Sequence, residues 1–200
     1  MSNWLPHPII LKGEIVELLP LEKAHFNELI SLAKDERIWE FYSINGAKED
    51  RLLIALESGL TDREHGNQYP FVIYHKKEQK LIGSTRYIDI HPYHKKLEIG
   101  WTWLHPDYWA SAVNLECKLL LLTYAFENLK AVRVQLKTDE NNIRSRKAIQ
   151  KIGGQFEGIQ RQDMIRDNGT HRNSAYFGLI DKDWEKTKEN LEKLYQEKKP

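Results

Sequence analysis

The sequence predicts a single α+β domain, in which a mixed and mostly antiparallel sheet of about seven strands is flanked by helices. Three observations support this fold class. Helical spacing of apolar residues dominates the first third of the chain, the period then changes to two over three consecutive segments, and strands and helices alternate from residue 98 onward. A strand, a long helix and a second strand in succession normally join parallel neighbours, so at least one strand pair should be parallel.

Length and composition are those of one globular unit. The 200 residues are 40% hydrophobic and contain no linker rich in Pro, Gly or Ser. We therefore expect one domain over residues 1–184, followed by a charged C-terminal helix or tail over 185–200 with a solvated face.

Charge and cysteine content exclude several classes of protein. Lys and Arg number 30 against 29 Asp and Glu, which leaves a formal charge of +1 and no electrostatic reason to expect direct contact with nucleic acid. Cys117 is the single cysteine, so a disulfide framework is excluded and a core position is favoured over a nucleophile. The N-terminus lacks a basic flank followed by an apolar run, and residues 119–122 are too short an apolar stretch to span a bilayer. We expect a cytoplasmic protein with no membrane partner.

The first half of the chain reads as strands, then helices, then strands. Two short apolar runs around Gly13 in residues 9–19 predict an opening strand pair or a bent strand, which Pro20 ends. Helical spacing follows over residues 21–33, around 38–42 and over 48–64. Alternation then predicts an antiparallel meander of three strands over residues 71–74, 81–90 and 96–104.

The segment from residue 98 to 154 is the most informative part of the chain. An aromatic strand over 98–104 leads through a proline-containing turn into a helix over 113–127, a strand over 132–137 and a helix over 143–152 that ends at two glycines. Residues 156–164 and 174–180 should form a final hairpin around D-N-G-T. Because a helix that begins directly after a strand presents unpaired N–H groups and a partial positive charge, its N-terminus suits a pyrophosphate.

A family resemblance extends over nearly the whole domain, from about residue 11 to 184. The segments that carry it are L-K-G-E-I-V-E-L-L-P-L, L-I-G-S-T-R-Y, E-I-G-W-T-W-L-H-P-D-Y-W, V-N-L-E-C-K-L-L-L-L-T-Y-A-F-E and T-D-E-N-N-I-R-S-R-K-A-I-Q-K-I-G-G. On these segments the chain resembles the GNAT N-acetyltransferase superfamily and its RimJ/RimL-like branch, which includes ribosomal-protein N-terminal acetyltransferases. The resemblance implies acetyl-CoA as the acyl donor and an amine as the acceptor, and it is compatible with a homodimer.

The pyrophosphate loop of that family usually reads Q/R-x-x-G-x-G/A. The aligned residues here are Trp109, Ala110, Ser111, Ala112, Val113 and Asn114. Ala112 stands where a glycine lets phosphate approach the backbone closely, and its methyl group is tolerated if its φ is negative. Ser111 and Asn114 can donate to phosphate or cap the helix. The alternative is that either residue is only an N-cap, in a fold that has lost its cofactor.

The resemblance also assigns residues along the rest of the acyl donor. It places Asn142 near the pantetheine arm and Ser145 near the thioester sulfur. Many relatives carry a tyrosine, four residues before the helix-ending glycine, that protonates the departing thiolate, but Ile149 occupies that position here. Ser145 is the available substitute as a hydrogen-bond donor, and the alternative is that its hydroxyl only binds its own backbone.

The strand backbone around Trp103 and Leu104 should pair with the pantetheine amides as an added strand. A backbone N–H there would polarise the acetyl carbonyl and stabilise the oxyanion. Trp101 and Tyr108 are candidates for the wall of the acceptor pocket, with core packing as the alternative.

Amine acetylation needs a neutral amine, so a base or a water chain leading to one is expected. Glu98 is the first candidate, because a carboxylate in an apolar, aromatic strand is desolvated and its pKa is raised. Since it lies near the strand start, a surface position is the alternative. Glu116 is interpreted as a structural complement to the helix dipole. His91 and His94 lack further ligands, so no metal site is predicted.

The expected function is direct acetyl transfer from acetyl-CoA to a primary amine. By resemblance the acceptor is the N-terminal α-amine of a protein, such as a ribosomal protein, and a small-molecule amine is the alternative. An open groove would favour a peptide, and a closed acidic cavity a small cation. A catalytically degenerate CoA-binding interaction module is the rival from another class, supported by Ala112 and Ile149. An RNA-contacting ribosome-associated factor is disfavoured by the balanced charge.

Overall fold

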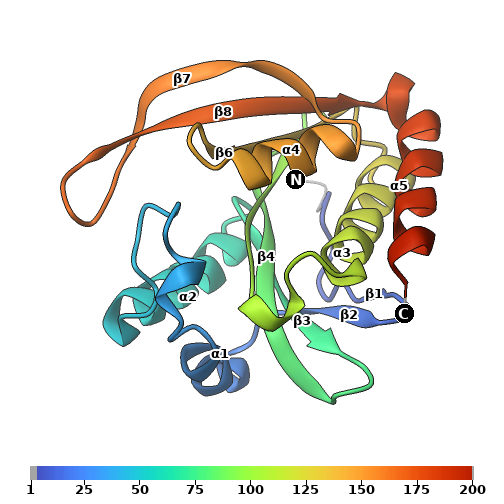
Figure 1. The fold of residues 1–200 in the computed structure, drawn as a ribbon. Helices are drawn as coiled ribbons and strands as arrows, with labels where there is room; N and C mark the ends of the chain where they lie inside the picture. Colours follow the sequence, from blue (N-terminus) through green and yellow to red (C-terminus); the bar gives the residue numbers. More distant parts are fainter. Residues whose placement is uncertain (1–3, 200) are drawn as a thin grey trace.

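One mixed sheet of eight strands runs through residues 4–199, the part of the chain that the computed structural model describes (Figure 1). The strand order across the sheet is β1-β2-β3-β4-β5-β6-β8-β7. The strands are Leu11–Lys12 (β1), Val16–Pro20 (β2), Tyr69–His75 (β3), Lys80–His91 (β4), Lys96–Leu104 (β5), Arg133–Asp139 (β6), Gln155–Ile165 (β7) and His171–Ile180 (β8). Within this sheet only β5 and β6 are parallel neighbours, which confirms the predicted parallel pair.

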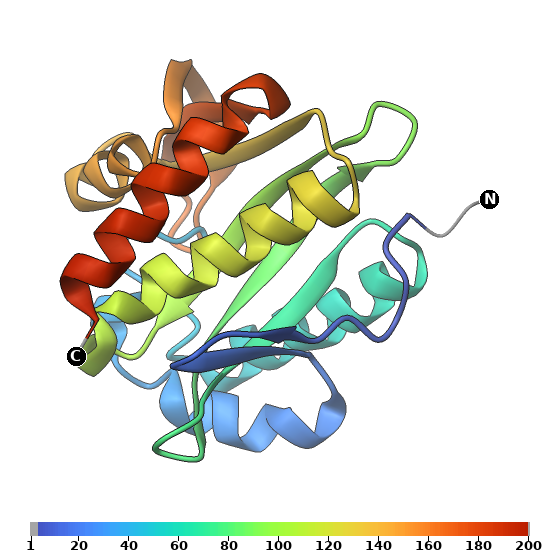
Figure 2. The same cartoon turned by 90° about the vertical axis from the view of Figure 1, so that its right-hand side faces the viewer.

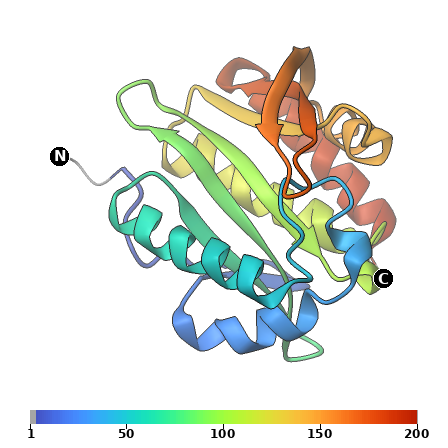
Figure 3. The ribbon, with the colours of Figure 1, turned by 90° about the vertical axis from the view of Figure 1, so that its left-hand side faces the viewer.

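Helices cover both faces of the sheet. They are Phe26–Leu32 (α1), Glu49–Glu64 (α2), Ala112–Thr123 (α3), Ile143–Lys151 (α4) and Trp184–Lys198 (α5). Helices α3 and α5 lie side by side on one face (Figure 2), and α1 and α2 lie on the other (Figure 3). Helix α4 contacts β6 and β8. No helix between residues 4 and 199 is long and apolar enough to cross a bilayer.

The first third of the chain departs from prediction at one element. The helical spacing around residues 38–42 does not give a helix, and only a single 3₁₀ turn, Glu36–Ile38, forms there. Trp39 explains the difference, because its side chain is 4% exposed and its indole N–H donates to the carbonyl of Ala33 at 2.8 Å. Apolar spacing here reflects burial of an irregular segment in the core beneath α1 and α2.

Two apolar clusters fill the molecule, one on each side of the sheet. The larger packs α3 and α5 against the sheet, and the smaller packs α1 and α2 against β3, β4 and β5. Cys117 is fully buried in the larger cluster, as the sequence predicts. The sheet is therefore held between two hydrophobic layers, and its strand ends are the places left for a site.

Helix α5 forms part of the larger cluster. The predicted solvated face is one side of this helix, and its other side is buried through Leu191, Leu194 and Tyr195, together with Trp184 at the start of the helix. The apolar residues recur at helical spacing among Lys and Glu, so one stripe packs on α3 while the charges face outward.

Candidate active site

A cleft opens where β5 and β6 separate. The two strands pair only over their first three residues, Lys96–Glu98 against Arg133–Gln135. Beyond that point they diverge and leave a cavity of about 420 Å³, lined by β5, β6, the first turns of α3, helix α4 and the segment before α2. The divergence leaves one edge of β5 without a strand partner, which makes it a template for a ligand with amide groups.

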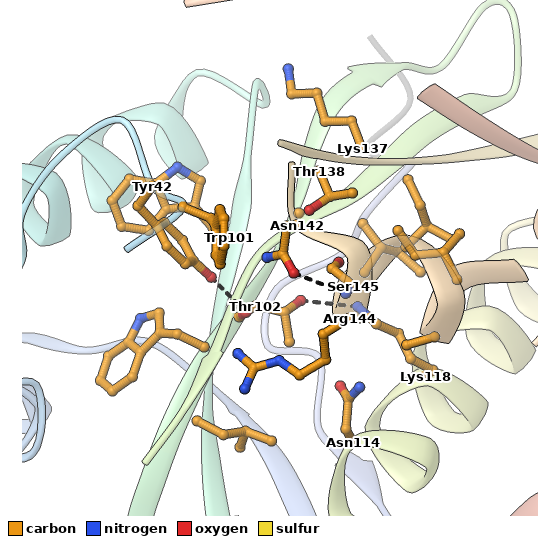
Figure 4. Close-up of a pocket in the computed structure, with 18 of the residues that line it drawn as sticks. Tyr42, Trp101, Thr102, Asn114, Lys118, Lys137, Thr138, Asn142, Arg144 and Ser145 are labelled. Atoms are coloured by element: carbon orange, nitrogen blue, oxygen red, sulfur yellow. Dashed lines mark hydrogen bonds between the residues drawn. The ribbon is translucent and has the colours of Figure 1, made fainter. Parts of the chain in front are cut away.

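A β-bulge in β5 shapes the middle of the cleft. Ser84 pairs with Trp103 and Arg86 with Gly100, so Trp101 and Thr102 together face the single residue Thr85. Trp101 adopts a left-handed φ of 53°. The bulge turns the Trp101 side chain to one side of β5 and the Thr102 hydroxyl toward α3 (Figure 4).

The backbone of β5 beyond the bulge presents polar groups to the cleft. The amide of His105 donates to Ile82 of β4 at 2.9 Å, and alternation along an antiparallel strand then directs the amide of Leu104 away from β4. The Leu104 carbonyl accepts from the Trp109 indole at 3.0 Å, and the Thr102 carbonyl accepts from the Tyr42 hydroxyl at 2.6 Å. Trp103 and Leu104 both line the cavity, where the sequence places them.

The loop before α3 is built around a left-handed residue. That residue is Ala110, with a φ of 59°, and it is exposed. Ala112, in contrast, is the first residue of α3, is 2% exposed and is not among the residues with positive φ. The condition set for tolerating a methyl group at Ala112 is therefore met, and the position that would favour glycine is two residues earlier.

Ser111 and Asn114 differ in their partners. Ser111 is the N-cap of α3: its Oγ accepts from the Val113 amide at 3.2 Å and donates to the Tyr108 carbonyl at 2.7 Å. The Oδ1 atom of Asn114 is buried and has no hydrogen-bond partner within residues 4–199. Asn114 lines the cavity while Val113 is buried behind it. A buried acceptor without a hydrogen-bond partner, next to a helix N-terminus, is typical of a site where a polar ligand binds.

Glu98 lies at the opposite end of the cleft from this loop, in the part of β5 still paired with β6. Its side chain is buried, not at the surface, and burial raises the pKa of the carboxyl above its ordinary value. One oxygen, Oε2, accepts from the Gln135 side chain at 2.7 Å and lies 3.8 Å from Lys137 Nζ. The other, Oε1, is buried without a partner within the described residues.

Helix α4 contributes the second wall. Asn142 is its N-cap, with Oδ1 accepting from the Ser145 amide at 2.9 Å, and both residues line the cavity (Figure 4). Ile149 also lines the cavity with an apolar side chain, so α4 supplies no phenol at the position of the relatives' tyrosine. The Ser145 hydroxyl is the polar group that α4 offers in its place.

Lys118 is a feature of the site that the sequence reasoning missed. It lies one helical turn after Asn114, is 7% exposed, and its Nζ donates to the Thr102 hydroxyl at 2.9 Å. Burial lowers the pKa of this ammonium to about 8. The signal in the sequence is a lysine between the buried positions of a helix whose inward residues, apart from Glu116, are apolar.

The aromatic side chains divide between the site and the core. Trp101 and Trp109 both line the cavity. The guanidinium of Arg144 lies over the Trp109 ring, 4.1 Å from the ring centroid. Tyr108 does not line it, and its assignment to the acceptor pocket is corrected here. The Tyr108 side chain turns toward β3 and β4, where its hydroxyl donates to Glu78 at 2.7 Å.

The Glu98 end of the cleft is bounded by two segments that are distant in sequence. The chain before α2 supplies Tyr42 and Ser43, and the β7–β8 hairpin supplies Met164. The hairpin tip is fastened to this chain, because the Asp167 amide donates to the Ser43 carbonyl at 2.9 Å and the Asp167 carboxylate accepts from the Asn45 amide at 3.0 Å (Figure 3).

The lining of the cavity is basic. Glu98 is its only carboxylate among the described residues. Its cationic residues are Lys118, Lys137, Arg144, Lys151, Arg172 and Lys198. Such a surface attracts phosphates and carboxylates and repels polycations.

Glu116 has the structural role that the sequence predicts, through different contacts. Its buried carboxylate accepts from the amides of Glu14 at 2.6 Å, Ile15 at 3.0 Å and Val16 at 2.8 Å, and from the Tyr195 hydroxyl at 2.7 Å. One side chain thus joins α3 to the β1–β2 turn and to α5.

Comparisons with known proteins place this geometry among acetyltransferases. A model described as the acetyltransferase (GNAT) domain matches residues 16–155. YdaF of Bacillus subtilis, whose provisional name is ribosomal N-acetyltransferase, is 31% identical over 105 residues, which are 52% of this chain and 56% of YdaF, so the match spans little more than half of that relative. YjcK of B. subtilis, provisionally named an N-acetyltransferase, is 23% identical over 87% of this chain and 98% of its own. A crystal structure from T. thermophilus, provisionally named an acetyltransferase, superposes with a TM-score of 0.84 at 31% identity, covering 94% of this chain and 98% of that one.

Proposed function

Because the chain belongs to the GNAT acetyltransferase family, we propose that it transfers the acetyl group of acetyl-CoA to the N-terminal α-amine of a protein or peptide. One observation carries the proposal. The cleft between β5 and β6 has free helix N–H groups at one end and a buried carboxylate at the other. The end with the helix N–H groups therefore suits the phosphates of the acyl donor, and the end with the carboxylate suits the amine.

Residues at the α3 end suit the acyl donor. The amides around Ala110 to Asn114 suit the diphosphate as hydrogen-bond donors, Asn114 Oδ1 can accept from an N–H or O–H group of the acyl donor, and Arg144 and Lys198 supply positive charge. The edge of β5 that has no strand partner and the Asn142 side chain suit the pantetheine arm. The donor itself supplies an activated acyl carbon and a thiol leaving group.

Residues at the Glu98 end suit the amine. The unpartnered Oε1 is free to accept a proton from the attacking amine, directly or through one water, while Gln135 holds Oε2. As the nitrogen attacks the acyl carbon, the backbone amide at Leu104 is the candidate donor to the oxyanion. The carbon–sulfur bond then breaks, and sulfur leaves with the electron pair.

Proton affinity favours an α-amine over a lysine side chain as the acceptor. An α-amino group has an ordinary pKa of about 7.7–8.0, against about 10.4 for lysine, so a larger fraction is neutral at physiological pH and a carboxylate base suffices. The basic cavity also disfavours a polyamine, because Lys137 and Arg172 line it with Glu98 as the only carboxylate among the described residues.

A small amine that carries its own carboxylate, such as a free amino acid, is the second candidate. Arg172 favours it: this side chain lines the cavity, is 8% exposed, and its Nε has no hydrogen-bond partner among the described residues. Arg172 Nε lies 3.9 Å from Asp139, whose carboxylate is already paired with Arg166. An acceptor carboxylate would give Arg172 Nε the hydrogen-bond partner that Asp139, at 3.9 Å, does not supply.

The test is an acceptor panel with acetyl-CoA, followed by thiol release and by mass spectrometry of the acceptor. The panel contains a peptide with a free N-terminus, the same peptide with a blocked N-terminus and an internal lysine, free amino acids and spermidine. We expect acetylation of the free N-terminus alone. Preferential acetylation of amino acids would support the second candidate, and preference for spermidine would contradict both. Acetyl-CoA binding without transfer to any amine would favour the interaction module instead.

A further inference from the structure

Lys118 is a buried cation without an anionic partner. Its side chain is 7% exposed, and within residues 4–199 no carboxylate oxygen lies within ion-pair distance of Nζ. The contact it makes is the 2.9 Å hydrogen bond to the neutral Thr102 hydroxyl. Since buried ammonium groups are normally paired, this arrangement is costly unless an anion arrives during function.

The position of Lys118 places it between the two ends of the cleft. It follows Asn114 by one turn, about 6 Å along α3, on the side of the helix that lines the cavity. Figure 4 shows its side chain extending from α3 to the Thr102 hydroxyl at the bulge of β5, with Ser145 nearby on α4. Glu98 lies further along β5 and its charge acts on Lys118.

In an acyl donor stretched along this cleft, sulfur lies between the pantetheine arm and the acetyl group. The loop before α3 suits the diphosphate and Glu98 suits the amine, so the atoms in the middle are the sulfur and the acyl carbon. Lys118 and Thr102 occupy that middle on the α3 side. Two anions form there during transfer: the oxyanion on the acyl carbon, for which the Leu104 amide is the candidate donor, and then the thiolate of CoA.

On this geometry, and resting on the proposed function, we propose that Lys118 is the general acid that protonates the departing CoA sulfur. When the tetrahedral intermediate collapses, the carbon–sulfur bond breaks and its electron pair moves to sulfur. One N–H bond of the Lys118 ammonium gives its proton to sulfur, which yields the CoA thiol and a neutral lysine. Solvent then reprotonates Lys118, and the proton removed from the amine leaves through Glu98.

The electrostatics of the cavity suit an acid for this purpose. Burial lowers the pKa of Lys118 to about 8, and the charge of Glu98 opposes this shift. An ordinary thiol has a pKa of about 8.5, so proton transfer between the two groups is nearly balanced. A serine hydroxyl is a far weaker acid, so Ser145 can donate a hydrogen bond to sulfur without replacing this role. The other charged side chains that line the cavity are Glu98, Lys137, Arg144, Lys151, Arg172 and Lys198.

The test compares Lys118→Met and Lys118→Arg with the exposed control Lys186→Met. Calorimetry with CoA and with desulfo-CoA, which lacks the thiol, isolates the contact to sulfur. We expect the wild type and Lys186→Met to bind CoA at least about tenfold more tightly than desulfo-CoA at pH 8, and Lys118→Met to lose the difference. Thiolate absorbance should show that the bound CoA thiol has a lowered pKa in the wild type and not in Lys118→Met.

Kinetics separate an acid from a mere cation. We expect Lys118→Met to lower turnover about a hundredfold, within the usual range for a general acid, and to remove a loss of activity above pH 8 that the wild type shows. Lys118→Arg keeps the charge but cannot release a proton, so it should retain the preference for CoA over desulfo-CoA and still lose turnover. Lys186→Met should melt at the wild-type temperature, and Lys118→Met should melt no lower than the wild type, because it removes a buried charge that has no anionic partner.

Three results would overturn the proposal: equal binding of CoA and desulfo-CoA by the wild type, unchanged turnover of Lys118→Met, or an acetyl group found on Lys118 itself after turnover. If the wild type transfers no acetyl group to any amine, the proposed function fails, while the comparison of CoA with desulfo-CoA still decides whether Lys118 meets the sulfur.

Discussion

The surroundings of Glu98 suit this side chain to the proposed role of a base. Its two oxygens differ, because Gln135 holds Oε2 and Oε1 has no partner among the described residues. Burial raises the pKa of the carboxyl, and Lys137, 3.8 Å away, acts in the opposite direction. A carboxylate with one fixed and one free oxygen is positioned to accept a proton from a group entering the cleft.

Replacing Glu98 with Gln should lower turnover about a hundredfold and leave acetyl-CoA affinity unchanged, because the amide keeps the shape but cannot accept the proton. The base works only when ionised, so wild-type activity should rise with pH through a pKa above that of an ordinary glutamate. This rise should be absent in the variant. Rates that match the wild type across the pH range would remove Glu98 from the mechanism.

Glu116 connects three elements through one carboxylate, and its contribution should be to stability. Hydrogen bonds to a charged acceptor are worth about 1.5–3 kcal/mol each, and Glu116 receives them from three amides and the Tyr195 hydroxyl. We expect Glu116→Gln to lower the free energy of unfolding by about 2–4 kcal/mol, measured by denaturant titration. Tyr195→Phe, which removes only one of these donors, should cost about 1–2 kcal/mol. Equal losses would contradict the role given to the backbone amides.

At the scale of elements, the turn between β5 and α3 owes its shape to Ala110. A left-handed alanine costs energy that glycine avoids, yet the helix that follows is capped normally by Ser111. The two positions where the family pattern has glycine or another small residue, Ala112 and Asn114, both lie in α3, whereas the left-handed backbone falls at Ala110, where that pattern specifies no glycine. Of these three residues, only Ala110 strains the chain.

The two alanines should respond to glycine with opposite signs. Ala110→Gly relieves a left-handed φ and should leave the free energy of unfolding unchanged or raise it by up to about 1 kcal/mol, after the entropy of the unfolded chain is counted. Ala112→Gly places glycine in the helix and should lower the free energy of unfolding by about 0.5–1 kcal/mol. Denaturant unfolding of both variants measures these changes, and stabilisation by Ala112→Gly would contradict the assigned backbone geometry.

Helix α5 supports the site from outside the strands and helices that form most of the cleft. It packs along α3, and its last turn brings Lys198 Nζ to the Ala110 carbonyl at 2.6 Å. The loop before α3 is therefore supported from the far end of the chain. An element rich in Lys and Glu contributes both a buried stripe and a cation at the mouth of the cleft.

At the scale of the whole molecule, β5 and β6 separate within a single sheet, and the acyl donor should bind in the cleft between them. A ligand that binds only the native state raises its stability, by about 2.7 kcal/mol at one hundred times its dissociation constant. We expect acetyl-CoA and CoA to raise the melting temperature, with ATP at the same concentration as the control for nonspecific phosphate binding. No shift at millimolar acetyl-CoA would contradict the assignment of the cleft.

Much of the fold could be predicted because local patterns decided it. The meander, the strand–helix–strand order and the parallel pair follow from apolar periods of two and of about 3.6 and from connection length. The region around residues 38–42 could not be predicted, because burial of Trp39 produces helical spacing without a helix. The prediction for Tyr108 is wrong for a similar reason: its neighbours in sequence line the cavity, while its own side chain turns to Glu78.

By itself the sequence determined the class of fold and the family, because these depend on periodicity and on the order of elements, and it also predicted residues of β5 and of the starts of α3 and α4 that line the cleft. Only the tertiary structure decided that Glu98 is buried with one free oxygen, that Ala110 carries the left-handed backbone, that α5 completes the domain, and that Lys118 points into the cavity without an anion. The physical reason is that the burial and the partners of a side chain depend on segments far away in the chain. The local spacing of apolar residues does not predict contacts with those distant segments.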